Sequence, residues 1–122
     1  LPALSKGLLG RNTESLKNLT KMKNSDLIIT TTAEAKPGKE NIVQQALCDV
    51  AKAARAQPGC IEYNIFRSTE DSAITVNFER WVSKAERDTF LAGADVKKFA
   101  SAVSGAFVEP PQPISYEILN KG

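Results

Sequence analysis

The stretch CIEYNIFRSTEDSAITVNFERW, residues 60–81, decides the fold of this chain. Its two ends, residues 60–68 and 73–81, are rich in β-branched and aromatic residues, which are typical of strands. The link between them, TEDS (69–72), is short and polar, as turns are. Two strands with so short a link predict an antiparallel hairpin.

The second strand of this hairpin alternates in character. Successive side chains of a strand point to opposite faces, so Val76 and Phe78 are expected on one face and Asn77, Glu79 and Trp81 on the other. A buried amide or carboxylate needs a partner, which makes the polar stripe a poor sealed core. The stripe therefore predicts either the wall of a cavity or a polar seam between subunits.

The segments before the hairpin predict a strand and a helix. DLIITTTAEA (26–35) is rich in Ile and Thr and lacks Gly and Pro, so it reads as a strand. Val43, Leu47 and Val50 recur at helical spacing and indicate a helix over about 37–57, which a Pro-Gly pair ends.

The segments after the hairpin predict helical structure and a last strand. Ser83 and Glu86 form a capping-box pattern that begins a helix, and Asp95 is expected to be the N-cap of another. The proline-rich residues 109–113 read as a rigid connector to a strand at 114–120.

The order β-α-β-β-α-β predicts an α+β, ferredoxin-like domain over residues 26–122, with an antiparallel sheet and helices on one face. Neither face of the sheet is cleanly polar, unlike a face that meets water. Two copies packed sheet to sheet would bury both faces, so we predict a homodimer.

Composition limits the function. The chain has 122 residues, a net charge of +2 and no histidine. So small a charge does not favour nucleic acid, and no apolar run approaches the roughly 20 residues that span a bilayer. The missing histidine removes His-based metal sites, Ser-His-Asp triads and His-ligated haem, so any chemistry must use carboxylates, Lys, Arg, Tyr, Cys or the substrate's own reactivity.

Residues 1–25 form a basic N-terminal extension with five basic side chains against one acidic one, a net of +4. Residues 13–23 could form a short helix, or the segment could be a loose tail. Cys48 is expected well inside the helix and Cys60 after its end, too far apart for a disulfide. Free thiols favour a cytoplasmic location, and export after signal cleavage stays the alternative.

Three stretches in order, KPGKE (36–40), QPGCIEYNIFRS (57–68) and FERW (78–81), resemble the antibiotic biosynthesis monooxygenase family. The resemblance spans residues 26–120. It implies a protomer that pairs into a dimeric α/β barrel, with a cavity between sheet and helices. Some members of the family oxidise aromatic phenols with dioxygen and without metal or flavin, related members degrade haem, and others act on quinols.

The resemblance also implies roles for single residues. Asn77 and Trp81 have the spacing of the catalytic Asn and Trp in the aromatic-oxidising members, so Asn77 would hydrogen-bond a substrate oxyanion and Trp81 would stack on a flat ring. Glu79 is expected as a base or as the ion-pair partner of an Arg or Lys across subunits. Tyr63 could reach the pocket or serve hairpin packing.

The pattern departs from the family within TFLAGADVKKF (89–99). Many members carry two histidines where this chain has Phe90 and Asp95, and the following Phe99 matches. Phe90 and Phe99 are expected to pack in the core or to line the cavity and contact substrate. The missing histidines disfavour haem degradation.

Two functions therefore stay open at this stage. The first is a cofactor-independent monooxygenase that oxidises a small aromatic phenol or quinol with dioxygen. The alternative is a non-catalytic, dimeric protein that binds a small molecule or serves a stress response.

Overall fold

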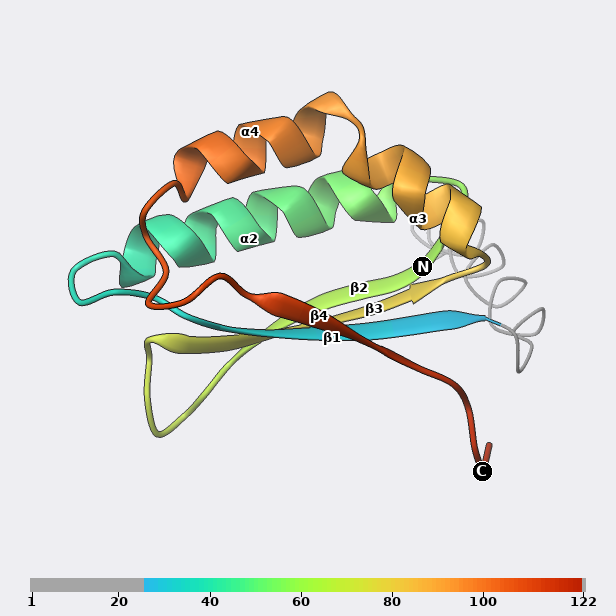
Figure 1. Cartoon of the computed structure of the whole chain (residues 1–122), viewed down its shortest axis with the longest axis horizontal. Coiled ribbons are helices and arrows are strands. Elements are labelled where there is room, and N and C mark those ends of the chain that lie inside the picture. The colour runs from blue at the N-terminus through green and yellow to red at the C-terminus, as the bar shows by residue number, and fades with distance from the viewer. Residues whose placement is uncertain (1–25, 122) are drawn as a thin grey trace, which may run out of the picture.

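The computed structural model describes residues 26–121, so the basic extension and the predicted helix within 13–23 lie outside the described residues. Four strands and three helices follow one another in this part of the chain (Figure 1). In chain order they are β1 (Leu27–Glu34), α2 (Glu40–Arg55), β2 (Cys60–Arg67), β3 (Ile74–Trp81), α3 (Lys84–Leu91), α4 (Ala94–Ala102) and β4 (Gln112–Tyr116).

The strands form one antiparallel sheet in the order β2-β3-β1-β4. The helices lie on one side of this sheet, and the opposite side carries no helix (Figure 1). The predicted ferredoxin-like fold and the predicted hairpin of β2 and β3 are both confirmed. In the hairpin turn, the Ser68 hydroxyl accepts hydrogen bonds from the backbone N–H groups of Glu70 and Asp71.

The alternation along β3 is confirmed. Thr75, Asn77, Glu79 and Trp81 are buried beneath the helices, while the intervening side chains are half-buried on the other face. Register extends this division across the sheet, because directly paired residues share a face. Ile29 pairs with Glu79 and belongs to the helix-covered face, whereas β4 residues such as Ile114 belong to the open face.

Two helix starts differ from expectation. Helix α2 begins at Glu40 rather than Pro37, because Gly38 has φ of 83°, which a right-handed helix excludes. Ser83 caps α3 as predicted, since its hydroxyl accepts from the Glu86 N–H at 3.3 Å. The prediction that Asp95 caps α4 is wrong, because Gly93 occupies the N-cap and Asp95 falls within the first turn.

The last strand is also shifted. β4 spans Gln112–Tyr116 instead of 114–120, because its partner β1 begins at Leu27 and Ile28 already pairs with Tyr116. At the other end, β4 takes in Pro113, which an edge strand tolerates. The chain after β4 runs away from the helices, below the sheet (Figure 1).

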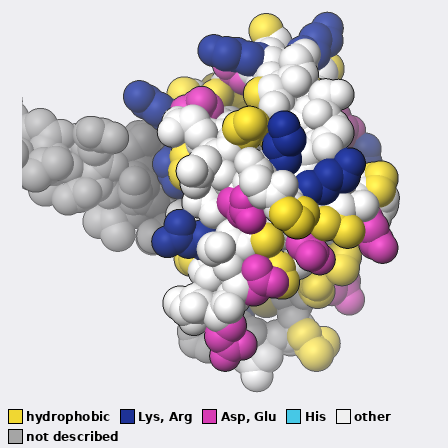
Figure 2. Space-filling model, turned by 90° about the vertical axis from the view of Figure 1, so that its left-hand side faces the viewer, with side chains coloured by type: hydrophobic (Ala, Val, Ile, Leu, Met, Phe, Trp, Pro, Cys, Tyr) yellow, Lys and Arg dark blue, Asp and Glu magenta, His cyan; other side chains and the backbone are white. Residues whose placement is uncertain are grey.

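The core between helices and sheet has two clusters of buried residues. One surrounds Trp81, the largest fully buried side chain, and the other surrounds Val43 and Leu47 of α2. Cys48 and Cys60 are free thiols, as predicted. The end of the molecule that Figure 2 shows carries basic, acidic and hydrophobic side chains together. Within residues 26–121, no helix has the length and apolar character needed to cross a membrane.

Candidate functional site

A cavity of about 240 Å³ lies between the sheet and the helices, between the two core clusters. Its lining is mostly apolar and comes from every helix and strand of the described fold. The polar lining residues are Thr31, Tyr63, Asn77, Glu79 and Arg87. The apolar lining residues are Ala33, Leu47, Val50, Phe90, Leu91, Val96, Phe99, Phe107, Pro111 and Pro113. A small set of convergent polar groups in an apolar hollow is typical of a site for a small molecule.

The polar floor of the cavity comes from β3 and its neighbour β2. Asn77 and Glu79 alternate with the open-face residues of β3, which places both under the helices at 8% and 3% exposure. Tyr63 of β2 pairs with Glu79, and its hydroxyl accepts a hydrogen bond of 3.4 Å from Nδ2 of Asn77. The phenol and the amide therefore form one polar pair on the cavity floor.

Tyr63 keeps its proton at any ordinary pH. Burial raises the pKa of its phenol above the usual value of 10.0, and the negative charge of Glu79 raises it further. The hydrogen bond from Asn77 and the charge of Arg87 act in the opposite direction and are weaker. The hydroxyl oxygen of Tyr63 accepts from Asn77, and no acceptor for its hydrogen occurs among the described residues, so this hydrogen can be donated to a ligand.

A buried ion pair stands beside this polar pair. Oε1 of Glu79 accepts hydrogen bonds from Nε of Arg87 at 3.0 Å and from Nε1 of Trp81 at 2.9 Å. Oε2 of Glu79 accepts from Nη2 of Arg87 at 3.4 Å. The expected cationic partner of Glu79 thus comes from α3 of the same chain, which corrects the expectation of a pair across subunits.

Trp81 lies behind the cavity rather than in its wall. It is 0% exposed, it is not among the residues that line the cavity, and its ring centroid is 5.6 Å from that of Phe90. Phe90 does line the cavity, as do Asn77, Tyr63, Glu79 and Phe99. Five of the six candidate residues therefore meet around one hollow.

Arg87 is a charged lining residue that the sequence analysis did not name as a candidate. Its side chain reaches Glu79 from the first helix after the hairpin. The signal in the sequence was the buried carboxylate of Glu79, which requires a cation, and a cation eight positions further along the chain supplies it. The sequence does not indicate which nearby Arg or Lys lies over β3.

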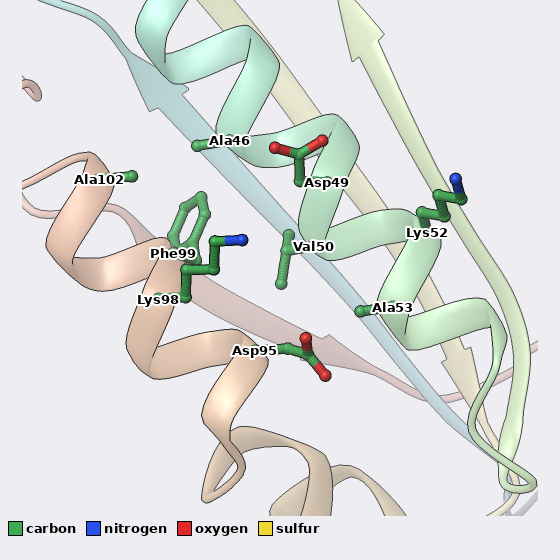
Figure 3. A pocket seen from close by; sticks show the side chains of 9 residues that line it. All are labelled: Ala46, Asp49, Val50, Lys52, Ala53, Asp95, Lys98, Phe99 and Ala102. Carbon is green, nitrogen blue, oxygen red and sulfur yellow. The ribbon is translucent and has the colours of Figure 1, made fainter.

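A second hollow lies outside the cavity, between α2 and α4. This groove has a volume of about 320 Å³ (Figure 3). Alanines and charged side chains make up most of its lining. It is lined by Ala46, Asp49, Val50, Lys52, Ala53, Asp95, Lys98, Phe99 and Ala102. Val50 and Phe99 line both the groove and the cavity.

Cys60 is a poor nucleophile. Its thiol is buried, and burial raises its pKa from 9.0 to about 12, with a further contribution from the charge of Glu79. Among the described residues, no group of three or more Cys, Asp or Glu side chains is arranged to hold a metal ion.

Comparison with known proteins places this chain in a family. The model of the family described as "Antibiotic biosynthesis monooxygenase" matches residues 27–102, which is more than half of the chain. The chain belongs to this family. A search of curated proteins gave no significant match.

Solved structures share the fold at low identity. A "putative antibiotic biosynthesis monooxygenase" from Nitrosomonas europaea superposes with a TM-score of 0.74 at 17% identity, covering 80% of this chain and 94% of that one. A Pseudomonas aeruginosa protein gives 0.74 at 19% identity, with 79% and 96% covered. A Mycobacterium tuberculosis protein gives 0.73 at 18%, with 80% and 98% covered. These likenesses show the fold alone.

Proposed function

We propose that this protein is a monooxygenase that binds a small, flat phenol or quinol in the cavity and oxidises it with dioxygen, without metal or flavin. The observation that carries the proposal is that three side chains with hydrogen-bond donors, Asn77, Tyr63 and Arg87, converge in a mostly apolar cavity. Membership of the monooxygenase family supports the same reaction class.

Binding would use the two kinds of lining separately. The aromatic rings of Phe90 and Phe99 and the aliphatic side chains of α2 offer apolar contact to a flat ring. The substrate oxygen would accept hydrogen bonds from the free hydrogen of Asn77 Nδ2 and from the hydroxyl of Tyr63. Arg87 adds a positive charge nearby, which favours the ionised form of the substrate.

The oxidation itself would draw on the substrate's own electrons. The phenol loses its proton to water, and the electron-rich anion passes one electron to dioxygen. The two radicals combine through a new C–O bond, and the peroxide takes up a proton and loses water. One oxygen atom stays on the ring as a carbonyl, the other leaves as water, and the four electrons that dioxygen gains come from the substrate. The protein contributes orientation, desolvation and donors to the oxyanion.

Trp81 would act on this site through Glu79 in our proposal. Its indole N–H and the guanidinium of Arg87 both donate to the same carboxylate oxygen, so Trp81 helps to fix the position of Arg87. This places Trp81 as a positioning residue instead of a stacking platform.

The open face of the sheet supports the proposed homodimer. Phe66 is 56% exposed and Ile114 is 54% exposed on this face, and Tyr116 lies with them. Exposed apolar side chains on one face of a sheet mark an interaction surface. A second copy packed on this face around a two-fold axis would cover them.

One observation favours the non-catalytic alternative. Both oxygens of Glu79 already accept hydrogen bonds, and Tyr63 holds its proton, so the cavity offers no free base to a substrate. A phenol that does not ionise readily would then bind without reacting. The protein would in that case be a binder of small aromatic molecules.

Oxygen uptake distinguishes these two functions. The purified, chelator-treated protein is mixed with anthrone- and quinol-type substrates, and dissolved oxygen is followed with an electrode. We expect turnover that falls about 100-fold in Asn77→Ala, because a preorganised donor to an oxyanion contributes on that order. Asn64→Ala, an amide removed from the open face of the same sheet, serves as the matched control.

The possible results lead to different conclusions. Turnover that survives chelation and depends on Asn77 supports the monooxygenase. Tight binding of these aromatics with no oxygen uptake supports the binder instead. Activity that vanishes with the chelator and returns with a metal ion contradicts the proposed mechanism.

A further inference from the structure

We propose that Phe99 sets the length limit of the ligand, because its ring closes the cavity toward the groove between α2 and α4. This inference rests on the proposed function, in which the cavity takes a small aromatic ring. It adds that the natural substrate is compact and that a single side chain excludes longer ones.

Phe99 stands on the boundary between the two hollows. It lines the cavity on one side and the groove on the other, a position it shares only with Val50 among the described lining residues of these two hollows. Its ring extends from α4 toward α2, and the side chain of Lys98 is drawn between it and Val50 (Figure 3). Because Phe99 and Val50 line both hollows, these two side chains are the partition in our proposal.

Phe99 is the larger and the less firmly held half of this partition. Val50 is a buried member of one core cluster, whereas Phe99 is half-buried and packs against both clusters from outside. Helix α4, which carries Phe99, contributes no fully buried residue in the described structure. Shortening Phe99 therefore removes the larger half of the partition while both clusters keep their buried members.

The volumes give this partition a consequence for ligand size. The cavity of about 240 Å³ lies just below the roughly 300–1,000 Å³ that is usual for small-molecule pockets, and the groove adds about 320 Å³. A ligand confined to the cavity must be compact. A ligand that extended past Phe99 would gain the apolar surface of Ala46, Ala53 and Ala102 in the groove.

The orientation of the site directs a substituent toward Phe99. The donors Asn77 and Tyr63 belong to the sheet, and Phe99 belongs to the helix layer on the other side of the cavity. A phenol whose hydroxyl meets the sheet thus points its para substituent toward the helices. A series of 4-alkylphenols consequently measures the distance to the partition.

The experiment is calorimetric titration of 4-alkylphenols, from ethyl to octyl, into the full chain and its Phe99→Ala and Phe99→Leu variants. Each methylene that finds apolar space should tighten binding about fourfold. In the natural protein, the affinity should stop rising, and then fall, once the alkyl group of the ligand is long enough to meet Phe99. In Phe99→Ala the gain should continue for several more methylenes, with Phe99→Leu in between.

Val96→Ala is the matched control, because Val96 lines the cavity but not the groove. It enlarges the cavity without joining the two hollows. The alkyl length at which affinity stops rising, called the break below, should therefore move by no more than one methylene. Thermal unfolding of each variant establishes that it is folded before titration. Phe99→Leu, which keeps most of the apolar bulk, covers the case in which Phe99→Ala does not fold.

The outcomes separate the two proposals. A break at the same alkyl length in the natural protein and in both Phe99 variants overturns the proposal that Phe99 limits ligand length. It leaves the proposed function standing. A shift as large in Val96→Ala overturns the proposal about Phe99 as well. Failure of every phenol to bind overturns both proposals, whereas a shifted break without oxygen uptake supports Phe99 in a non-catalytic binder.

Discussion

The two faces of the sheet differ in which side chains they bury. Beneath the helices, the polar residues Asn77 and Glu79 are almost fully covered. On the open face of the same sheet, the hydrophobic residues Phe66 of β2 and Ile114 of β4 are more than half exposed. Both faces thus depart from the usual distribution of polar and apolar residues, in opposite directions.

Both departures lower the stability of the single chain. Burying a carboxylate and a guanidinium costs free energy that well-packed apolar residues would not cost. Leaving apolar rings in water forgoes stabilisation of the single chain. The covered face therefore suggests a small-molecule site, and the open face suggests a contact with a second copy. The following predictions test each side of the contrast, beginning with the largest effect.

Breaking the buried ion pair should have the largest effect. Arg87→Met leaves the Glu79 carboxylate buried without its cation, which should lower the free energy of unfolding by about 3–5 kcal/mol. Urea denaturation measures the loss. The double variant Arg87→Met with Glu79→Gln should recover most of it, because no unpaired charge remains. Losses that simply add in the double variant would show that the two side chains do not depend on each other.

A charge on the open face should act on association instead of folding. Ile114→Lys should weaken self-association by about 100-fold, roughly 3 kcal/mol, because it places a charge in the proposed seam. Sedimentation over a range of concentrations measures this. Leu119→Lys is the control, because Leu119 lies beyond β4 and is 96% exposed. A natural protein that is already monomeric at micromolar concentration would contradict the prediction.

Trp81→Phe should affect stability more than ligand binding. The variant loses the hydrogen bond to Glu79 and should lower the free energy of unfolding by about 2 kcal/mol. Because Trp81 does not line the cavity, the dissociation constant of a phenol should change less than about threefold. Asn77→Ala, which removes a lining donor, should weaken the same ligand more. A larger loss of binding in Trp81→Phe would restore the stacking role.

Alkaline pH should destabilise the covered face. The folded-state pKa values of Tyr63 and Cys60 lie above their usual values, 10.0 and 9.0, so the folded chain holds protons that the unfolded chain releases. The contribution of the two groups to the free energy of unfolding is fully present below about pH 9. It should fall as pH rises, by at most about 1.4 kcal/mol per pH unit for each group. Urea denaturation between pH 8 and 11 measures the slope.

The control for this slope removes both groups. Tyr63→Phe combined with Cys60→Ala should flatten the decline, because neither replacement titrates. An unchanged slope in the double variant would assign the alkaline loss to other side chains.

The sequence predicted those parts of the fold that depend on neighbouring residues. The alternation along β3 placed Asn77 and Glu79 on the covered face, and the Ser83 capping box marked the start of α3. Both signals act over a few residues, so no knowledge of the tertiary fold was needed. The cavity itself, and the expectation that Phe90 and Phe99 line it, came from the family resemblance, and five of the six candidate residues do line one hollow.

The parts that the sequence did not predict depend on distant contacts. The end of β4 is set by where its partner β1 begins, and no residue near Tyr116 carries that information. The role of Arg87 depends on how α3 crosses β3, and the cover over Trp81 depends on Phe90. The proposed stacking role of Trp81 came from spacing along one strand, which says nothing of what lies above it.

The proline in β4 restricts how copies of this protein can meet. β4 forms one edge of the sheet, and Pro113 removes one backbone N–H from it, with Pro110 and Pro111 just before. An incoming strand would find an interrupted ladder at this edge, which discourages growth of a continuous sheet from chain to chain. In the proposed dimer, packing through the open face of the sheet would end at two copies, whereas pairing through the edge strands would continue from chain to chain.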